Sequence, residues 1–306
     1  MTQPGESVVP PAPSRNRVSL ETGGDRDALL AAAREVGRFD ADTAVQPRGA
    51  GVFDVYLDPR WNGFGPNGGY IGAVLLRAMA TELGDTEHRP RSLTVHYARP
   101  CAPGPATVEV TVLRRGRTVC SLEARLRQQD SVCTVALGAF IPPGGGPEFA
   151  DVPLPDMPAP ETIPAYGFDP RFMPNFAAAW ESRPAGPVPF AGVAEAHFFG
   201  WLRLAERRRA DALSLTAMAD ALAPSITARM DAPTHIMPTV DLTVHFPNPV
   251  PAGLAPDEQL AVRFRSHIAS AGVVVEDGWI WTRSGLLVAQ ARQLAVLVEV
   301  RPGVAG

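Results

Sequence analysis

Apolar and polar residues alternate along two stretches of the chain, and each stretch predicts a helix followed by a series of β-strands. The helix predicted at 70–83 is apolar on almost every side over about four turns, so we expect it to be buried. A second helix, predicted at 210–222, is also apolar on most sides, and a short amphipathic helix is predicted at 25–36. The alternation predicts strands at 52–57, 92–98, 107–114, 118–128 and 132–140 in the first stretch, and at 194–204, 240–246, 260–268, 273–282 and 286–298 in the second.

One strand sequence occurs twice in the chain. TVHYARP at 94–100 returns as TVHFPNP at 243–249, about half a chain length later. In each copy the Val and the aromatic residue lie on one face of the strand, while the Thr and the His lie on the other. Solenoid and propeller units repeat about every 20–50 residues. The much longer spacing found here indicates two tandem copies of one domain, that is, a fused dimer.

The repeated order of elements predicts an α+β protein. We expect a tandem (double) hotdog, in which each half is a buried helix wrapped by a curved antiparallel sheet. The predicted parts are a disordered tail at 1–24, an N-terminal hotdog at 25–142, a Pro/Gly-rich linker at 143–189 and a C-terminal hotdog at 190–300. The linker contains too many prolines to form the interior of a helix or a sheet. Its aromatic residues nevertheless indicate that part of it packs on the body: Phe168, Phe172, Phe176 and Trp180.

Composition narrows the classes of function that need to be considered. The chain has 306 residues, which is about two domains of ordinary size, and a small net charge of −4. Its basic run at 207–209 is interpreted as the solvated face of a helix, so we expect no nucleic-acid partner. The three cysteines form no even set and no CxxC pair, and the Pro/Ser/Arg-rich start contains no apolar segment. We therefore expect a cytoplasmic protein with no membrane partner.

The first predicted helix begins at the sequence Asn67-Gly68-Gly69-Tyr70. Glycines at the start of a buried helix let another group come close to the first free N–H donors. Those donors, together with the positive end of the helix dipole, suit a carbonyl oxygen that becomes negative during a reaction. The alternative is a tight turn that needs glycine only for its backbone angles.

The second predicted helix carries Asp220 in an otherwise apolar stretch. A carboxylate that faces a core is costly unless it is paired or functional, although Asp220 could equally lie on an exposed stripe. In the alignment of the two copies, Thr239 is equivalent to Pro90 and Gln293 is equivalent to Gly138. The polar residues thus occur only in the second copy and the glycine pair only in the first. This division predicts a single composite site at the seam between the copies.

Several of these motifs, in this order, resemble the double-hotdog acyl-CoA thioesterases of the acyl-CoA thioesterase II type and their thioesterase-like relatives. The resemblance covers roughly 52–298. It rests on Asn67-Gly68-Gly69-Tyr70 with its buried helix, SLTVHYARP at 92–100, Gly200-Trp201-Leu202-Arg203, Ala219-Asp220, PTVDLTVHF at 238–246 and Ala291-Arg292-Gln293.

The resemblance implies hydrolysis of an acyl-CoA or acyl-carrier-protein thioester without a cofactor. It implies that Asp220, Thr239 and Gln293 hold the hydrolytic water, with Asp220 as general base. The turn around Asn67 would bind the substrate, with Gly68 and Gly69 orienting the thioester carbonyl and the N–H groups of Gly69 and Tyr70 stabilising the oxyanion. Where the closest thioesterase II members have Gln after the glycine pair, this chain has Tyr70. That departure bears on the class of substrate.

Two other functions remain open at this stage. One is a hydratase-, dehydratase- or isomerase-like enzyme on the same fold, which would use His96 or His245 with an acidic residue. It is favoured if His245 points into the seam pocket beside Asp220 or Asp241. The other is a protein that binds acyl thioesters without turning them over. Both His residues occupy the same position in the two copies, so the fold explains them better than catalysis does. The sequence contains no GxSxG motif, which argues against a serine nucleophile, and no HExxH motif or paired cysteines, so it predicts no metal site. The fusion already supplies a hotdog dimer and leaves open a homo-oligomer of the double-hotdog unit.

Overall fold

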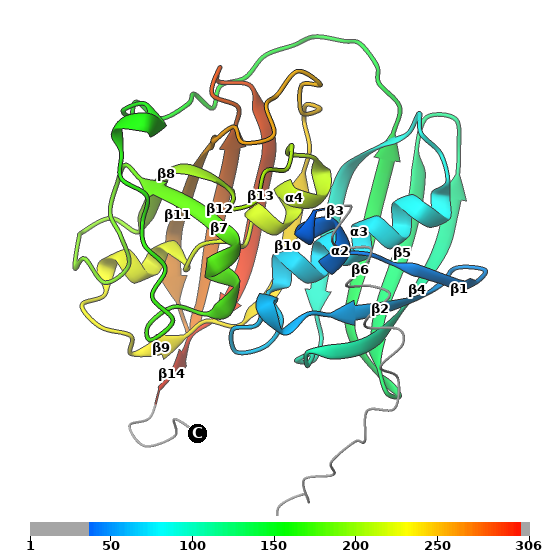
Figure 1. Cartoon of the computed structure of the whole chain (residues 1–306), viewed down its shortest axis with the longest axis horizontal. Coiled ribbons are helices and arrows are strands. Elements are labelled where there is room, and N and C mark those ends of the chain that lie inside the picture. The colour runs from blue at the N-terminus through cyan, green and yellow to red at the C-terminus, as the bar shows by residue number, and fades with distance from the viewer. Residues whose placement is uncertain (1–36, 301–306) are drawn as a thin grey trace, which may run out of the picture.

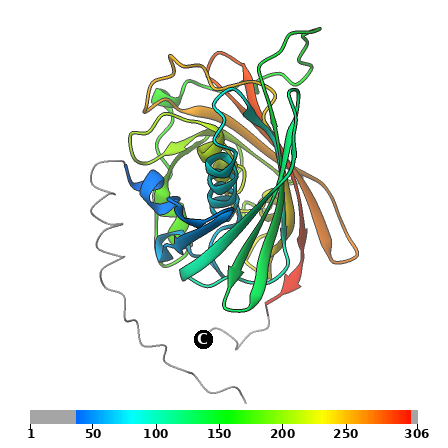
Figure 2. The ribbon, with the colours of Figure 1, turned by 90° about the vertical axis from the view of Figure 1, so that its right-hand side faces the viewer.

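The computed structural model describes residues 37–300. Within that range, most strands form one antiparallel sheet that bends around the central helices (Figure 1 and Figure 2). The helix predicted at 25–36 and the tail predicted to be disordered at 1–24 lie outside the described residues. None of the described helices is long and apolar enough to cross a membrane.

The first half has the predicted order of a long helix followed by strands. Helix α3 (Gly68–Leu83) is buried on nearly all sides, as its apolar pattern predicts. The Asn67 side chain caps its start by accepting a hydrogen bond from the Tyr70 N–H, and Gly84, with a φ of 61°, ends it in the left-handed conformation that glycine adopts without strain. The other elements of this half are α2 (Arg38–Asp42), β1 (Gln46–Gly49), β2 (Val52–Leu57), η1 (Pro59–Trp61), β3 (Arg89–Tyr97), β4 (Gly104–Arg115), β5 (Cys120–Gln128) and β6 (Ser131–Ile141).

The second half repeats this order with a much shorter helix. Helix α4 (Ala212–Met218) begins with a capping box between Asp211 and Ser214. The helix predicted at 210–222 is confirmed only in its first part, because the chain turns away after Met218. The other elements are η2 (Pro160–Thr162), η3 (Asn175–Ala179), β7 (Trp180–Pro184), β8 (His197–Leu204), η4 (Ser225–Arg229), β9 (His235–Ile236), β10 (Thr239–His245), β11 (Leu260–Ser270), β12 (Val273–Trp281), β13 (Leu287–Val296) and β14 (Val298–Glu299).

The order of strands in the large sheet shows the duplication directly. It runs β1-β2-β4-β5-β6-β3-β10-β13-β12-β11-β8-β7, and exchanging the two copies reverses it. Strands β9 and β14 form a separate small sheet. Each half therefore wraps its own helix with an equivalent set of strands, and the predicted tandem hotdog is confirmed.

The two halves meet where β3 pairs with β10. Thr94 lies directly opposite Thr243, and their hydroxyl oxygens are 3.1 Å apart. These two residues hold the same position in the repeated sequence, so the pseudo-twofold axis passes between them. Val95 and Val244 are buried on the inner face, while His96 and His245 are exposed on the outer one, as the alternation predicts.

The region predicted as a linker contains one strand of the main sheet. β7 pairs with β8 at one outer edge, as β1 pairs with β2 at the other. Proline is tolerated here because Pro184 is the last residue of an edge strand. Trp180 is buried and Phe176 packs against the core, as expected, whereas Phe172 is 82% exposed.

The basic run at 207–209 does not form the solvated face of a helix. It precedes α4, and the Arg208 guanidinium lies between Asp40 of α2 and Asp211, at 2.7 Å from each carboxylate. Burial would raise the pKa of Asp40, but hydrogen bonds from Arg208 and Arg77 outweigh it and hold that pKa below its usual value. The run thus supplies an ion pair between the two halves.

Candidate active site

The start of α3 touches the end of α4 at the centre of the molecule (Figure 1). Gly68 and Gly69 are the first two residues of α3 and have helical backbone, so the alternative of a tight turn that needs glycine for its angles is not met. A Cβ atom on Gly69 would lie 2.8 Å from the carbonyl oxygen of Ala217. Glycine is therefore required here because another segment approaches the backbone.

The group that approaches is Asp220 of the second half. It lies in the turn after α4 rather than on the helix, and its carboxylate points at the start of α3. Oδ2 of Asp220 accepts hydrogen bonds from the Gly69 N–H and from Nδ2 of Asn67, both at 3.0 Å. Nδ2 of Asn67 also donates to the Asp220 main-chain carbonyl at 2.7 Å. Two residues of the first half therefore hold the carboxylate of the second.

The environment of Asp220 changes its acidity strongly. Burial, with a smaller contribution from the negative charge of Glu276, raises the pKa of Asp220 from 3.8 to about 7. Hydrogen bonding by the Gly69 and Gly68 backbone and by Asn67 opposes this shift without cancelling it. A carboxyl group with a pKa near neutrality can accept a proton and return it at physiological pH, as a general base must.

The N–H groups predicted to receive the oxyanion already have partners in this structure. The Gly69 N–H donates to Asp220, and the Tyr70 N–H donates to Oδ1 of Asn67 at 2.9 Å. The Tyr70 ring stacks on Trp61 with 4.9 Å between centroids, and its hydroxyl donates to the Asp42 carbonyl at 2.6 Å. Tyr70, the departure from the thioesterase II pattern, thus fills the core of the first half. A role of this turn in binding substrate stays a prediction.

The other two predicted catalytic residues contact each other in the second half. Oγ1 of Thr239 donates to Oε1 of Gln293 over a long 3.4 Å, and Nε2 of Gln293 donates to Oε1 of Glu276 at 2.9 Å. Oε2 of Glu276 accepts the Ser225 N–H at 2.5 Å. Glu276 is only 5% exposed, and burial raises its pKa. The two hydrogen bonds of the Gln293 amide fix its orientation, with the nitrogen toward Glu276 and the oxygen toward Thr239.

The structure confirms the alignment on which the composite site was predicted. Gln293 pairs across the sheet with Leu242, and Gly138 pairs with the equivalent Leu93. A Cβ atom on Gly138 would lie 2.6 Å from Sδ of Met79 in α3. The long helix of the first half therefore occupies the space in which the second half places the Gln293 side chain.

The predicted residues form two separate groups, and the members of each group contact one another. Asp220 joins Asn67 and Gly69, while Thr239 joins Gln293. Among the described residues no hydrogen bond links the two groups. They are coupled electrostatically, because the charge of Glu276, which binds Gln293, raises the pKa of Asp220. Sequence reasoning missed Glu276, although a carboxylate in the apolar strand 273–281 is an available signal.

The surroundings of the two His residues do not support the dehydratase-like alternative. His96 and His245 are exposed on the outer face of the sheet, opposite to the face that covers α3 and α4. In the register of the seam, His245 lies across from Ser92 and His96 across from Asp241. Neither imidazole faces the carboxylate of Asp220.

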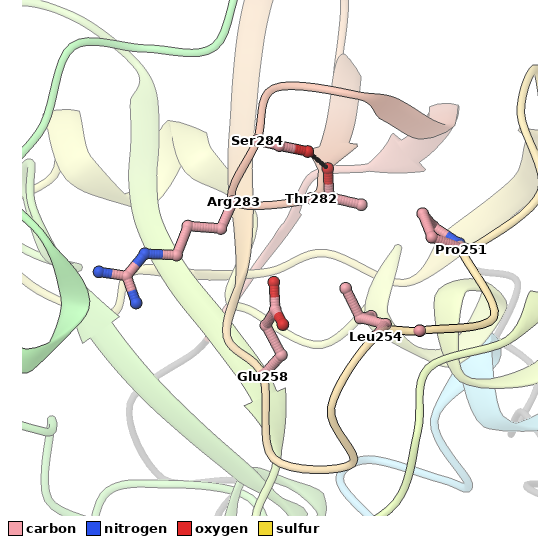
Figure 3. Close-up of a pocket in the computed structure, with 7 residues that line it drawn as sticks. Pro251, Leu254, Glu258, Thr282, Arg283 and Ser284 are labelled. Atoms are coloured by element: carbon pink, nitrogen blue, oxygen red, sulfur yellow. Dashed lines mark hydrogen bonds between the residues drawn. The ribbon is translucent and has the colours of Figure 1, made fainter.

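A surface pocket of about 450 Å³ lies away from these residues (Figure 3). It is formed by the loop before β11 and the turn between β12 and β13. Figure 3 shows Arg283 pointing away from the pocket, where its guanidinium pairs with Glu161 at 2.5 Å. None of the predicted site residues lines this pocket, whose walls are Pro251, Gly253, Leu254, Glu258, Thr282, Arg283 and Ser284.

The fold defines a double-hotdog protein, in which residues of the first half hold a carboxylate of the second. Residues 57–141 match the acyl-CoA thioesterase N-terminal domain and residues 152–297 match the acyl-CoA thioesterase C-terminal domain. A proposed thioesterase II from Thermobifida fusca YX is 30% identical, with a TM-score of 0.72 over 85% of this chain and 97% of that one. The chain belongs to the acyl-CoA thioesterase family, and its enzyme class is that of a thioester hydrolase.

Two further solved structures share the fold. A conserved protein of unknown function with a hotdog fold from Alicyclobacillus acidocaldarius has a TM-score of 0.77 at 24% identity, covering 86% of this chain and 98% of that one. An acyl-CoA thioesterase II from Mycobacterium marinum has a TM-score of 0.69 at 19% identity, covering 86% and 98%. No curated protein matches the chain.

Proposed function

We propose that the protein hydrolyses an acyl-CoA with an activated water at a single composite site between its two halves. One observation carries the proposal. The Asp220 carboxylate from the second half is clamped by Asn67 and Gly69 of the first half, and its pKa is about 7. A partly buried carboxylate that joins two domains and titrates near neutrality is typical of a catalytic base.

The clamp divides the work between the two carboxylate oxygens. Oδ2 accepts the hydrogen bonds from Asn67 and Gly69, and in this scheme Oδ1 faces the water. Asp220 takes a proton from this water as its oxygen bonds to the thioester carbonyl carbon. The tetrahedral intermediate then collapses, the carbon–sulfur bond breaks, and the thiolate recovers the proton from Asp220. The products are a carboxylic acid and the free thiol of coenzyme A.

Thr239 and Gln293 orient the water in this scheme, and Glu276 positions Gln293. Because Glu276 accepts the amide hydrogen of Gln293, the amide oxygen is left to accept a hydrogen from Thr239 or from the water. A fixed acceptor holds the water in the direction of attack and lowers the entropy lost on reaching the transition state.

The proposal is tested by release of free thiol from a panel of acyl-CoAs of short, long, branched and aromatic acyl groups. Asp220→Asn should lower kcat on the order of 100- to 10,000-fold, because the amide cannot accept the proton. Asp130→Asn, in the exposed turn between β5 and β6, is the matched control and should retain full activity. Near-full turnover in Asp220→Asn would refute the assignment. Binding of acyl-CoA by the parent without any thiol release would support the non-catalytic alternative instead.

A further inference from the structure

The hydroxyl of Tyr97 stands beside the carboxylate of Asp220. Tyr97 is the last residue of β3, and its side chain shares the inner face of the strand with Val95. A Cβ atom on Gly68 would lie 2.8 Å from the Tyr97 hydroxyl oxygen and 3.0 Å from Oδ2 of Asp220. The two polar groups thus lie close to the same backbone position at the start of α3. The glycine at position 68 is what lets both come so close.

The Tyr97 hydroxyl oxygen is buried and has no hydrogen-bond partner among the described residues. Buried hydroxyls nearly always have a partner, because burial without one forfeits the hydrogen bonds that water would make. An unpaired buried group next to a catalytic carboxylate therefore points to a partner that arrives with the substrate. Burial also raises the pKa of Tyr97 well above 10, and the charge of Asp220 adds to this effect, so the phenol stays protonated and remains a donor.

The duplication of the chain provides an internal control for this residue. The repeat places Phe246 at the position of Tyr97, and Phe246 is 4% exposed. The fold therefore needs an aromatic ring at this position but no hydroxyl. The hydroxyl occurs only in the copy whose strand end lies against the Gly68–Gly69 pair.

The proposed reaction needs a hydrogen-bond donor close to Asp220. A thioester carbonyl gains negative charge on its oxygen when water attacks, and that charge must be stabilised. The N–H groups of Gly69 and Tyr70 already donate hydrogen bonds to the side chains of Asp220 and Asn67. Tyr97 offers a buried donor whose hydrogen has no acceptor among the described residues.

We propose that Tyr97 is a catalytic residue that donates its hydroxyl hydrogen to the thioester carbonyl oxygen of the substrate. This inference rests on the proposed function. The proton stays on Tyr97 throughout, and no bond of the tyrosine breaks. The hydrogen bond strengthens as the carbonyl oxygen becomes an oxyanion, so it stabilises the transition state more than the bound substrate.

The experiment compares the parent, Tyr97→Phe and the control Tyr166→Phe, whose tyrosine is 46% exposed. Thiol release is measured on an acyl-CoA that the parent hydrolyses. Tyr97→Phe should lower kcat on the order of 100-fold, with KM changed only a few-fold, as expected for loss of an oxyanion donor. Its melting temperature should match or exceed that of the parent, because the second copy already carries phenylalanine at this position. Tyr166→Phe should behave like the parent.

A second measurement separates catalysis from a structural effect. The infrared stretch of the thioester carbonyl is recorded for the same acyl-CoA bound to Asp220→Asn, with and without Tyr97→Phe. A hydrogen bond from Tyr97 lowers the frequency, and Tyr97→Phe should abolish that shift. An active parent with kcat in Tyr97→Phe within about threefold of it, or an unchanged carbonyl frequency, overturns this inference alone. A parent that binds acyl-CoAs but hydrolyses none overturns the proposed function and this inference together.

Discussion

The two halves share a sheet and differ in what the sheet encloses. The first wraps the sixteen-residue helix α3, which is apolar almost throughout. The second wraps the seven-residue helix α4, and the space beyond it holds η4 and the polar chain of Ser225, Glu276 and Gln293. A duplicated domain can thus keep its strands while one copy becomes a packing element and the other gives part of its core to polar chemistry. The long helix presents its start to the site, and the short one makes room for it.

The sharpest way to break this division is to separate the helices. In Gly69→Ala the new methyl group would meet the main-chain oxygens of Ala217 and Thr216 at 2.8 and 2.9 Å, so Asp220 must move away from α3. We expect kcat to fall on the order of 100-fold and stability to fall by about 1–3 kcal/mol. Thiol release and urea denaturation measure both.

The control for that substitution is Gly49→Ala, because a Cβ atom on Gly49 would meet nothing within 4 Å. It should retain the activity of the parent. Wild-type kcat in Gly69→Ala would show that contact between the two helix ends is not needed for turnover.

A smaller effect is expected when the polar core of the second half is neutralised. Glu276→Gln removes the buried charge that raises the pKa of Asp220 and loosens the hold on Gln293. We expect kcat to drop about tenfold. In the parent, kcat/KM should rise with pH and level off above about 7, since Asp220 must be ionised to act as a base. Glu276→Gln should shift this limb to lower pH, and an unmoved limb would contradict the coupling of the two carboxylates.

The smallest effect concerns stability. The raised pKa means that the folded protein binds a proton at Asp220 more tightly than the unfolded chain, whose pKa is near 3.8. The stability that this tighter proton binding contributes is therefore complete below about pH 4 and is lost as the pH rises through about 7. Asp220→Asn does not ionise, so its melting temperature relative to the parent should increase by about 5 °C between pH 5 and pH 8. Equal pH dependence in parent and variant would rule out the raised pKa, and Asp130→Asn serves as the control.

Properties encoded in local patterns were predictable from the sequence. The alternation of apolar residues placed the strands, and the repeat at 94–100 and 243–249 placed the seam between β3 and β10. The same alignment correctly matched Gln293 with Gly138, because both lie opposite equivalent leucines in the sheet.

Contacts between distant segments were not predictable. Strand β7 is hidden in a proline-rich region because an edge position tolerates a proline that a central strand would not. The apolar pattern continues past Met218, so the predicted helix extended beyond the end of α4 and wrongly included Asp220. The partners of the Gly69 and Tyr70 N–H groups depend on how α3 meets the other half, which no local pattern records. Tyr97 was visible in the repeat, but only as an aromatic residue shared by both copies.

The continuous pairing of β3 with β10 has a consequence for how the enzyme responds to its own concentration. An ordinary dimer with a shared site loses that site on dilution, because its subunits separate. Here Asn67 and Asp220 belong to one polypeptide, and the strands that join their halves form the middle of a single sheet. The contact between Asn67 and Asp220 therefore forms once, during folding. If it is the active site, as proposed, specific activity per chain should stay constant from the most dilute solution to the most crowded one.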